Sequence, residues 1–194
     1  MRRIRTGSGW SGLRALAVLI VGGSLAAPAA AAERWIGLEV GTSDTSRVDP
    51  RAVDARRFNL SGRWSLPRAR FGQWALVPYG ELTVGAIRTW NAGEGQNLAL
   101  NETGVRLLFQ LHYLPWGRLF LEAGSGPMYL SDTRIGDLDL GSKLQFRSHA
   151  GLGVRLGSTK RWEVVYWYSH TSNANLSSPN PGINFHTVRL GFRY

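Results

Sequence analysis

Apolar residues alternate with polar ones along most of this chain. A period of two is typical of β-strands, whose successive side chains point to opposite faces. The clearest segment runs from Val105 to Tyr113, where every second residue is apolar. The other segments have these apolar positions: Ile36, Leu38 and Val40; Phe58, Leu60, Trp64 and Leu66; Trp74, Leu76, Leu82 and Val84; Leu119, Leu121 and Ala123; Phe146, Ala150, Leu152, Val154 and Leu156; Trp162, Val164, Tyr166 and Tyr168; Val188, Leu190, Phe192 and Tyr194. The pattern predicts about eight strands.

The positions between these apolar residues carry charged and polar side chains. They are Glu39, Arg63, Glu81, Arg106, Gln110, His112, Glu122, Arg147, His149, Arg155, Glu163, Arg189 and Arg193. A soluble sandwich or a lipocalin-like barrel would bury the apolar face and expose the charges. A membrane barrel inverts this arrangement, with apolar side chains toward lipid and charges paired in a narrow lumen. The alternation alone fits both.

The connectors between the segments favour the membrane barrel. Long polar connectors at residues 42–56, 89–100, 131–143 and 173–182 alternate with short turns at 67–73, 114–118 and 157–161. Long loops on one side and tight turns on the other are expected of outer-membrane barrels. We therefore predict an all-β fold, an eight-stranded antiparallel transmembrane β-barrel of the bacterial outer membrane. The terminal aromatic Tyr194 resembles the signal read by the barrel assembly machinery, an expected partner during insertion.

The first residues have the composition of an export signal. Arg2, Arg3 and Arg5 precede an apolar stretch at residues 15–27, and small residues follow it up to Ala32. The stretch is shorter than the about 20 residues of a membrane-spanning helix, although a retained anchor is the alternative reading. We expect a cleaved signal peptide at 1–32 and a single barrel domain at 33–194.

Charge and composition narrow the partners. The formal net charge of +10 falls to +6 when the four arginines of the signal peptide are removed. In an exported protein this basic balance favours anionic lipid headgroups, and we expect no nucleic-acid partner. The sequence has no cysteine, and its four histidines show no metal-ligand spacing with nearby carboxylates. We expect no metal and no cofactor.

Residues that could carry chemistry gather near the end of the seventh predicted strand. His170 and Ser172 are two apart, so they point to the same face, with Cβ atoms about 6–7 Å apart. Their parity is that of the lipid-facing residues, and the strand runs toward the outer leaflet. A neutral histidine can activate a serine by taking its proton, and Asn173 could donate an N–H group to the oxyanion. The spacing alone also fits an interfacial histidine beside a serine at a strand end.

A family resemblance gives this pair more weight. The run His170-Thr-Ser172-Asn173, followed by Pro179-Asn180-Pro-Gly, resembles the carboxy-terminal signature of the PagL-type lipid A 3-O-deacylases. The resemblance implies a serine esterase that cleaves the acyl chain at position 3 of lipid A in the outer leaflet. It implies that Ser172 is the nucleophile, His170 the base, Asn173 an oxyanion-hole contributor and Asn180 a conformational or substrate-positioning residue. The implied partners are lipid A or lipopolysaccharide, outer-membrane lipids and, as a candidate, a second copy in a homodimer.

The sequence departs from the family pattern at one position. Asn184 stands where a glutamate is the third member of the triad, on the same predicted face as His170. An asparagine carbonyl can orient an imidazole but cannot stabilise the imidazolium by charge, and a wrong tautomer at the triad acid can cost about 10⁴ in turnover. Two alternatives therefore stay open beside the enzyme: a weak or inactive structural or interaction barrel, and a soluble periplasmic lipid carrier.

Overall fold

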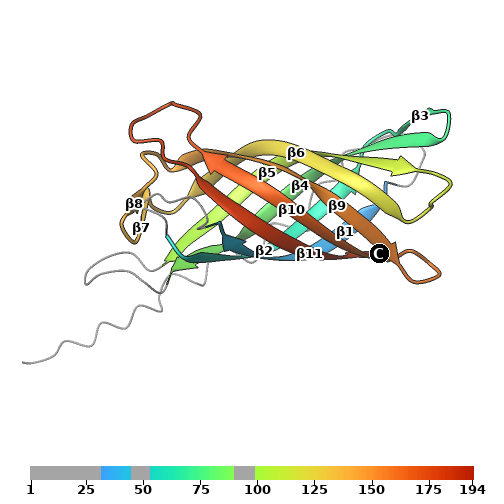
Figure 1. Ribbon diagram of the computed structural model, residues 1–194, viewed down its shortest axis with the longest axis horizontal. Coiled ribbons are helices and arrows are strands. Elements are labelled where there is room, and N and C mark those ends of the chain that lie inside the picture. The colour runs from blue at the N-terminus through green and yellow to red at the C-terminus, as the bar shows by residue number, and fades with distance from the viewer. Residues whose placement is uncertain (1–31, 45–52, 90–98) are drawn as a thin grey trace, which may run out of the picture. The chain divides into compact units, whose positions relative to one another are not determined.

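Eight long antiparallel strands close into a barrel. The computed structural model describes residues 32–44, 53–89 and 99–194, so the expected signal peptide lies almost wholly outside the described residues. The barrel strands are β1 (Arg34–Ser43), β2 (Ala55–Ser65), β4 (Trp74–Thr89), β5 (Ala99–Tyr113), β6 (Leu119–Leu130), β9 (Leu144–Leu156), β10 (Trp162–Ser172) and β11 (Ile183–Arg193). The first strand β1 pairs with both β2 and the last strand β11, which closes the sheet (Figure 1). The predicted fold is confirmed.

The barrel has two different ends, here called the loop end and the turn end. Short turns at residues 114–118 and 157–161 and the carboxyl terminus lie at the turn end, opposite the hairpin of β7 (Arg134–Ile135) and β8 (Leu138–Asp139) (Figure 1). One predicted turn contains a further strand, β3 (Ala69–Phe71), which extends the sheet by pairing with the start of β4. The connector after β10 is at the loop end, which places His170 and Ser172 there.

The barrel wall is apolar outside and polar inside. The outward side chains of Leu121 and Val105 are 55% and 51% exposed, whereas the inward Glu81 and Glu163 are fully buried. A soluble protein rarely exposes a continuous apolar band of this kind. The arrangement is the inverse of a soluble sandwich and matches a wall that faces lipid. In the described residues, no helix has the length and apolarity to span a bilayer.

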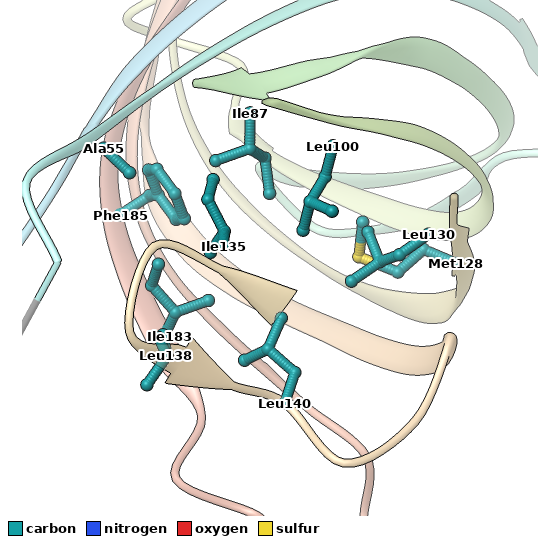
Figure 2. Packing of buried hydrophobic residues seen from close by; sticks show 10 residues of the cluster. All are labelled: Ala55, Ile87, Leu100, Met128, Leu130, Ile135, Leu138, Leu140, Ile183 and Phe185. Carbon is teal, nitrogen blue, oxygen red and sulfur yellow. The ribbon is translucent and has the colours of Figure 1, made fainter. Parts of the chain in front are cut away.

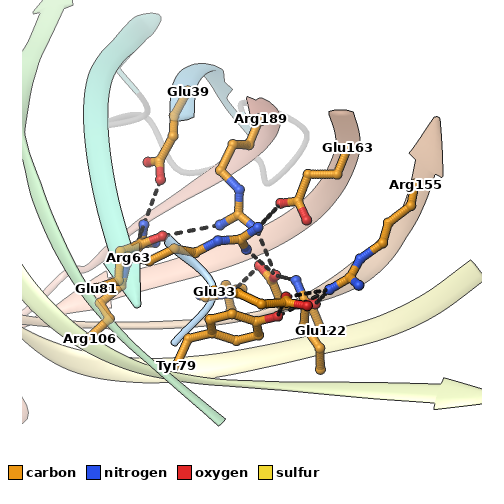
Figure 3. A network of polar contacts seen from close by, with 12 residues as sticks. Glu33, Glu39, Arg63, Tyr79, Glu81, Arg106, Glu122, Arg155, Glu163 and Arg189 are labelled. Atoms are coloured by element: carbon orange, nitrogen blue, oxygen red, sulfur yellow. Dashed lines mark hydrogen bonds and ion pairs between the residues drawn. The ribbon is translucent and has the colours of Figure 1, made fainter. Parts of the chain in front are cut away.

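The middle of the lumen is filled by a balanced ion-pair network. Five glutamates and five arginines are buried there among the described residues, so their formal charges cancel. Arg189 bridges three strands through Glu122 (2.6 Å), Glu163 (3.0 Å) and Glu81 (3.2 Å), as Figure 3 shows. Arg106 pairs with Glu39 at 2.7 Å and also with Glu81. Buried charges of this kind are tolerated because each has a partner of opposite sign.

An apolar cluster fills the lumen at the loop end. The hairpin residues Ile135 and Leu138 pack with inward residues of the wall (Figure 2). The cluster comprises Ala55, Ile87, Leu100, Met128, Leu130, Ile135, Leu138, Leu140, Ile183 and Phe185. This cluster could not be predicted from the alternation, because its inward apolar residues share the parity of the charged ones. The cluster lies inside the wall, whereas the side chains of His170 and Ser172 point outward from it.

Candidate active site

The structure brings His170, Ser172 and Asn184 together on the outer surface of the wall. His170 and Ser172 are the last two outward positions of β10, and Asn184 is directly opposite His170 on β11. His170 is exposed, and Ser172 and Asn184 are half-buried. Because directly opposed side chains in an antiparallel pair lie about 4.5–5.5 Å apart at Cβ, this register makes Asn184 a natural partner of His170.

A short hydrogen bond joins His170 to Asn184. The His170 Nδ1 atom and the Asn184 Oδ1 atom are 2.7 Å apart. Since a carbonyl oxygen only accepts, Nδ1 carries the proton and the Nε2 atom of a neutral ring is left with its lone pair. The amide therefore fixes the tautomer that a general base needs. It does not bring the negative charge that would stabilise the protonated ring.

Ser172 lies next to this imidazole without being bonded to it. Within the described part of the chain, no hydrogen bond joins the Ser172 hydroxyl to His170. Both side chains are on the same face of β10, where Cβ atoms two residues apart are about 6–7 Å from each other. Nucleophile–base contacts are often loose in the absence of substrate and tighten in the complex.

Gly182 lies against the edge of the His170 ring. A Cβ atom at this position would be 2.6 Å from the His170 Cε1 atom and 3.2 Å from Nε2, and the φ angle of Gly182 is +68°. Both the space and the left-handed backbone therefore require glycine. Gly182 ends the Pro-Gly pair of the family signature, but its proximity to the His170 ring could not be predicted from the sequence.

Asn173 and Asn180 fasten the connector that follows β10. The Asn173 backbone N–H donates to Asn180 Oδ1 at 3.0 Å, and Asn180 Nδ2 donates to Asn175 Oδ1 at 2.8 Å. The side-chain amide of Asn173 is fully buried and lies 3.0 Å from the carbonyl oxygens of Leu140 and Pro179. The backbone N–H and the side-chain amide of Asn173, the residue expected to donate to the oxyanion, thus both bond to other acceptors. The geometry assigns Asn173 to anchoring this loop against the neighbouring one.

A second polar group lies one position further from the loop end. His186 Nδ1 is 2.7 Å from the Tyr166 hydroxyl, and the Tyr168 hydroxyl donates to Asp44 at 3.0 Å. These side chains extend the polar surface below His170 on β10 and β11. In the ranges that the structure describes, no cluster of three histidine, cysteine, aspartate or glutamate side chains could hold a metal ion.

Known proteins share both the sequence pattern and the barrel. The family model described as Lipid A 3-O-deacylase (PagL) matches residues 57–193. The lipid A deacylase PagL of Bordetella bronchiseptica is 40% identical over 77 residues, 40% of this chain and 41% of the relative. That of Pseudomonas aeruginosa is 39% identical over 69 residues, 36% of this chain and 39% of the relative. The matches thus span about two fifths of these relatives.

A solved structure supports the fold. The crystal structure of the outer membrane enzyme PagL superposes with a TM-score of 0.66 and 22% sequence identity, covering 81% of this chain and 98% of that one. At this identity the likeness establishes the barrel architecture. Because the family model covers most of the barrel, the chain belongs to the lipid A 3-O-deacylase (PagL) family.

Proposed function

We propose that this protein is an outer-membrane lipid A 3-O-deacylase, a carboxylic ester hydrolase that uses no cofactor. The observation that carries the proposal is the His170–Asn184 hydrogen bond on the lipid-facing side of the wall, with Ser172 beside it. A serine and an oriented imidazole facing hydrocarbon are suited to a substrate that is itself a lipid. The family match supports the same reaction.

The reaction follows the two-step course of serine esterases. The Ser172 Oγ atom attacks the carbonyl carbon of the acyl ester while His170 Nε2 takes its proton. The tetrahedral intermediate collapses, the sugar oxygen leaves with the proton from His170, and the acyl chain remains on Ser172. Water activated by His170 then releases a free fatty acid. Asn173 and Asn180 act by holding the loop, whose remaining backbone N–H groups are the candidate oxyanion donors.

The surroundings follow from the same orientation. The apolar band would contact outer-membrane lipids, and the loop end would face the outer leaflet, where lipopolysaccharide resides. The barrel assembly machinery would insert the chain after removal of residues 1–32. A homodimer would bring a second wall beside the site.

Mass spectrometry of lipid A tests the proposal. Purified protein in detergent should remove the mass of one 3-linked acyl chain, and Ser172→Ala should abolish that loss while the barrel still folds. Intact lipid A after incubation with the unaltered protein, or unchanged activity after Ser172→Ala, would reject the mechanism.

One specific feature favours a second candidate, a structural or interaction barrel with little or no activity. Asn184 gives His170 orientation without charge. If the unaltered protein folds, binds lipid A and leaves it intact, this second function is the better account.

A further inference from the structure

Two serines form a hydroxyl pair on the lipid-facing wall. Ser125 on β6 and Ser148 on β9 are directly opposite each other, both are exposed, and their Oγ atoms are 2.9 Å apart. Outward positions of this wall are mostly leucine, valine and aromatic residues. A pair of exposed hydroxyls is therefore an exception on this apolar surface.

The pair belongs to the same level of the barrel as the candidate active site. Ser148 is directly opposite His170, and His170 is directly opposite Asn184. The neighbouring strands β6, β9, β10 and β11 thus each carry an outward polar side chain at one level. On β5, the residue opposite Ser125 is the apolar Leu107. Directly opposed residues have Cβ atoms about 4.5–5.5 Å apart. Ser148 and His170 are therefore close enough to contact neighbouring groups of one bound lipid.

The hydroxyls do not belong to the polar rim of the barrel. On β9, Phe146 lies between Ser148 and the loop end, and Leu152 lies on the other side. On β6, Ser125 is likewise flanked by outward Pro127 and Ala123. Apolar residues on both sides along each strand place the pair within the lipid-facing band.

The serine pair has one hydroxyl proton without an acceptor inside the pair. Two hydroxyls have two protons, and their mutual hydrogen bond uses one. The other proton has no water to bind within hydrocarbon, where an unsatisfied donor is costly. The pair therefore presents one donor toward the lipid phase, beside the atoms proposed to react.

We infer that Ser125 and Ser148 bind a second carbonyl oxygen of the lipid whose ester is cleaved at Ser172. The inference rests on the proposed function. In lipid A, an amide-linked acyl chain occupies the sugar carbon next to position 3, so a carbonyl acceptor adjoins the scissile ester. Hydrogen bonding to it would fix the sugar ring relative to His170 and select substrates that carry two neighbouring acyl groups.

A comparison of two substrates tests the inference. With Ser125→Ala/Ser148→Ala, the KM for lipid A should rise about threefold to tenfold, as expected for one lost hydrogen bond, with kcat little changed. Hydrolysis of a p-nitrophenyl fatty ester, which has no second carbonyl, should be unaffected. Thr103→Val, which removes an exposed outward hydroxyl on β5, is the matched control and should change neither.

Different failures have different signatures. An equal loss on both substrates would assign the serines to structure, and an unchanged KM for lipid A would overturn the inference. If the unaltered protein leaves lipid A intact, the proposed function fails first. The inference is then tested by lipid A titration of Ser172→Ala protein, where the two serine substitutions should weaken Kd by the same factor; an unchanged Kd overturns it.

Discussion

The lumen and the outer surface at His170 are both polar, but they are organised in opposite ways. In the lumen, Arg189 touches three carboxylates and is buried with them. On the outer surface, His170 has one neutral partner, Asn184, and Gly182 lies against the ring edge that carries Cε1 and Nε2. Paired charges hold strands together, whereas an active base must keep a lone pair available. The same barrel therefore carries its paired charges inside and the candidate catalytic residues outside.

The largest expected effect comes from breaking the lumen network. Arg189→Met should destabilise the barrel by about 3–5 kcal/mol, because it leaves Glu81, Glu122 and Glu163 short of a buried partner. Urea unfolding in lipid vesicles, or the temperature at which the folded band disappears on a gel, measures this. Protein that remains folded should keep its activity. A loss of activity at unchanged stability would contradict the view that the lumen network acts on stability alone.

Asn184→Glu should change activity without changing stability, the reverse of the Arg189 substitution. A carboxylate opposite His170 would keep the hydrogen bond to Nδ1 and add the charge that stabilises the imidazolium, so kcat should rise about tenfold to a hundredfold. Stability should hardly change. Asn184→Gln, which has the length without the charge, is the control. Equal activities of the Glu and Gln variants would mean that the missing charge at position 184 does not limit the proposed activity.

The smallest effect is expected at Glu33, where the lumen network meets the turn end. Burial would raise the pKa of Glu33, but the charges of Arg155 and Arg193 and the hydrogen bond from Tyr79 outweigh it and hold the pKa below its usual value. The stability that this carboxylate contributes is present above the unfolded-state pKa and is lost as the pH falls through the lowered folded-state value. Glu33→Gln should therefore be slightly destabilising at neutral pH and neutral in strong acid, as pH-dependent unfolding would show. A difference that persisted in acid would contradict this sign.

The sequence predicted the barrel because period-two alternation determines which face each side chain occupies. Parity placed His170, Ser172 and Asn184 on one face, the connector lengths indicated that this face is the outward one, and the structure agrees. It could not reveal the apolar cluster around Ile135 and Phe185, which depends on a hairpin folding into the lumen. The engagement of Asn173 with Leu140 was also hidden, because it joins two loops far apart in sequence.

The register between distant strands was the other missing information. Ser148 and His170 lie on the two strands joined by the short turn at residues 157–161, but the long connector at 131–143 separates Ser125 from Ser148, and no local pattern relates these two serines. Only the pairing of β6, β9 and β10 brings them to one level of the wall. Residues that lie side by side on neighbouring strands can be identified only when the strand pairing is known.

Covalent labelling by a long-chain alkyl fluorophosphonate tests the central claim most directly. The reagent should modify Ser172 in folded protein in detergent, as located by peptide mass spectrometry, and His170→Ala should slow the labelling strongly. No label on Ser172, or labelling that is indifferent to His170, would contradict a lipid-facing serine activated by its neighbouring imidazole.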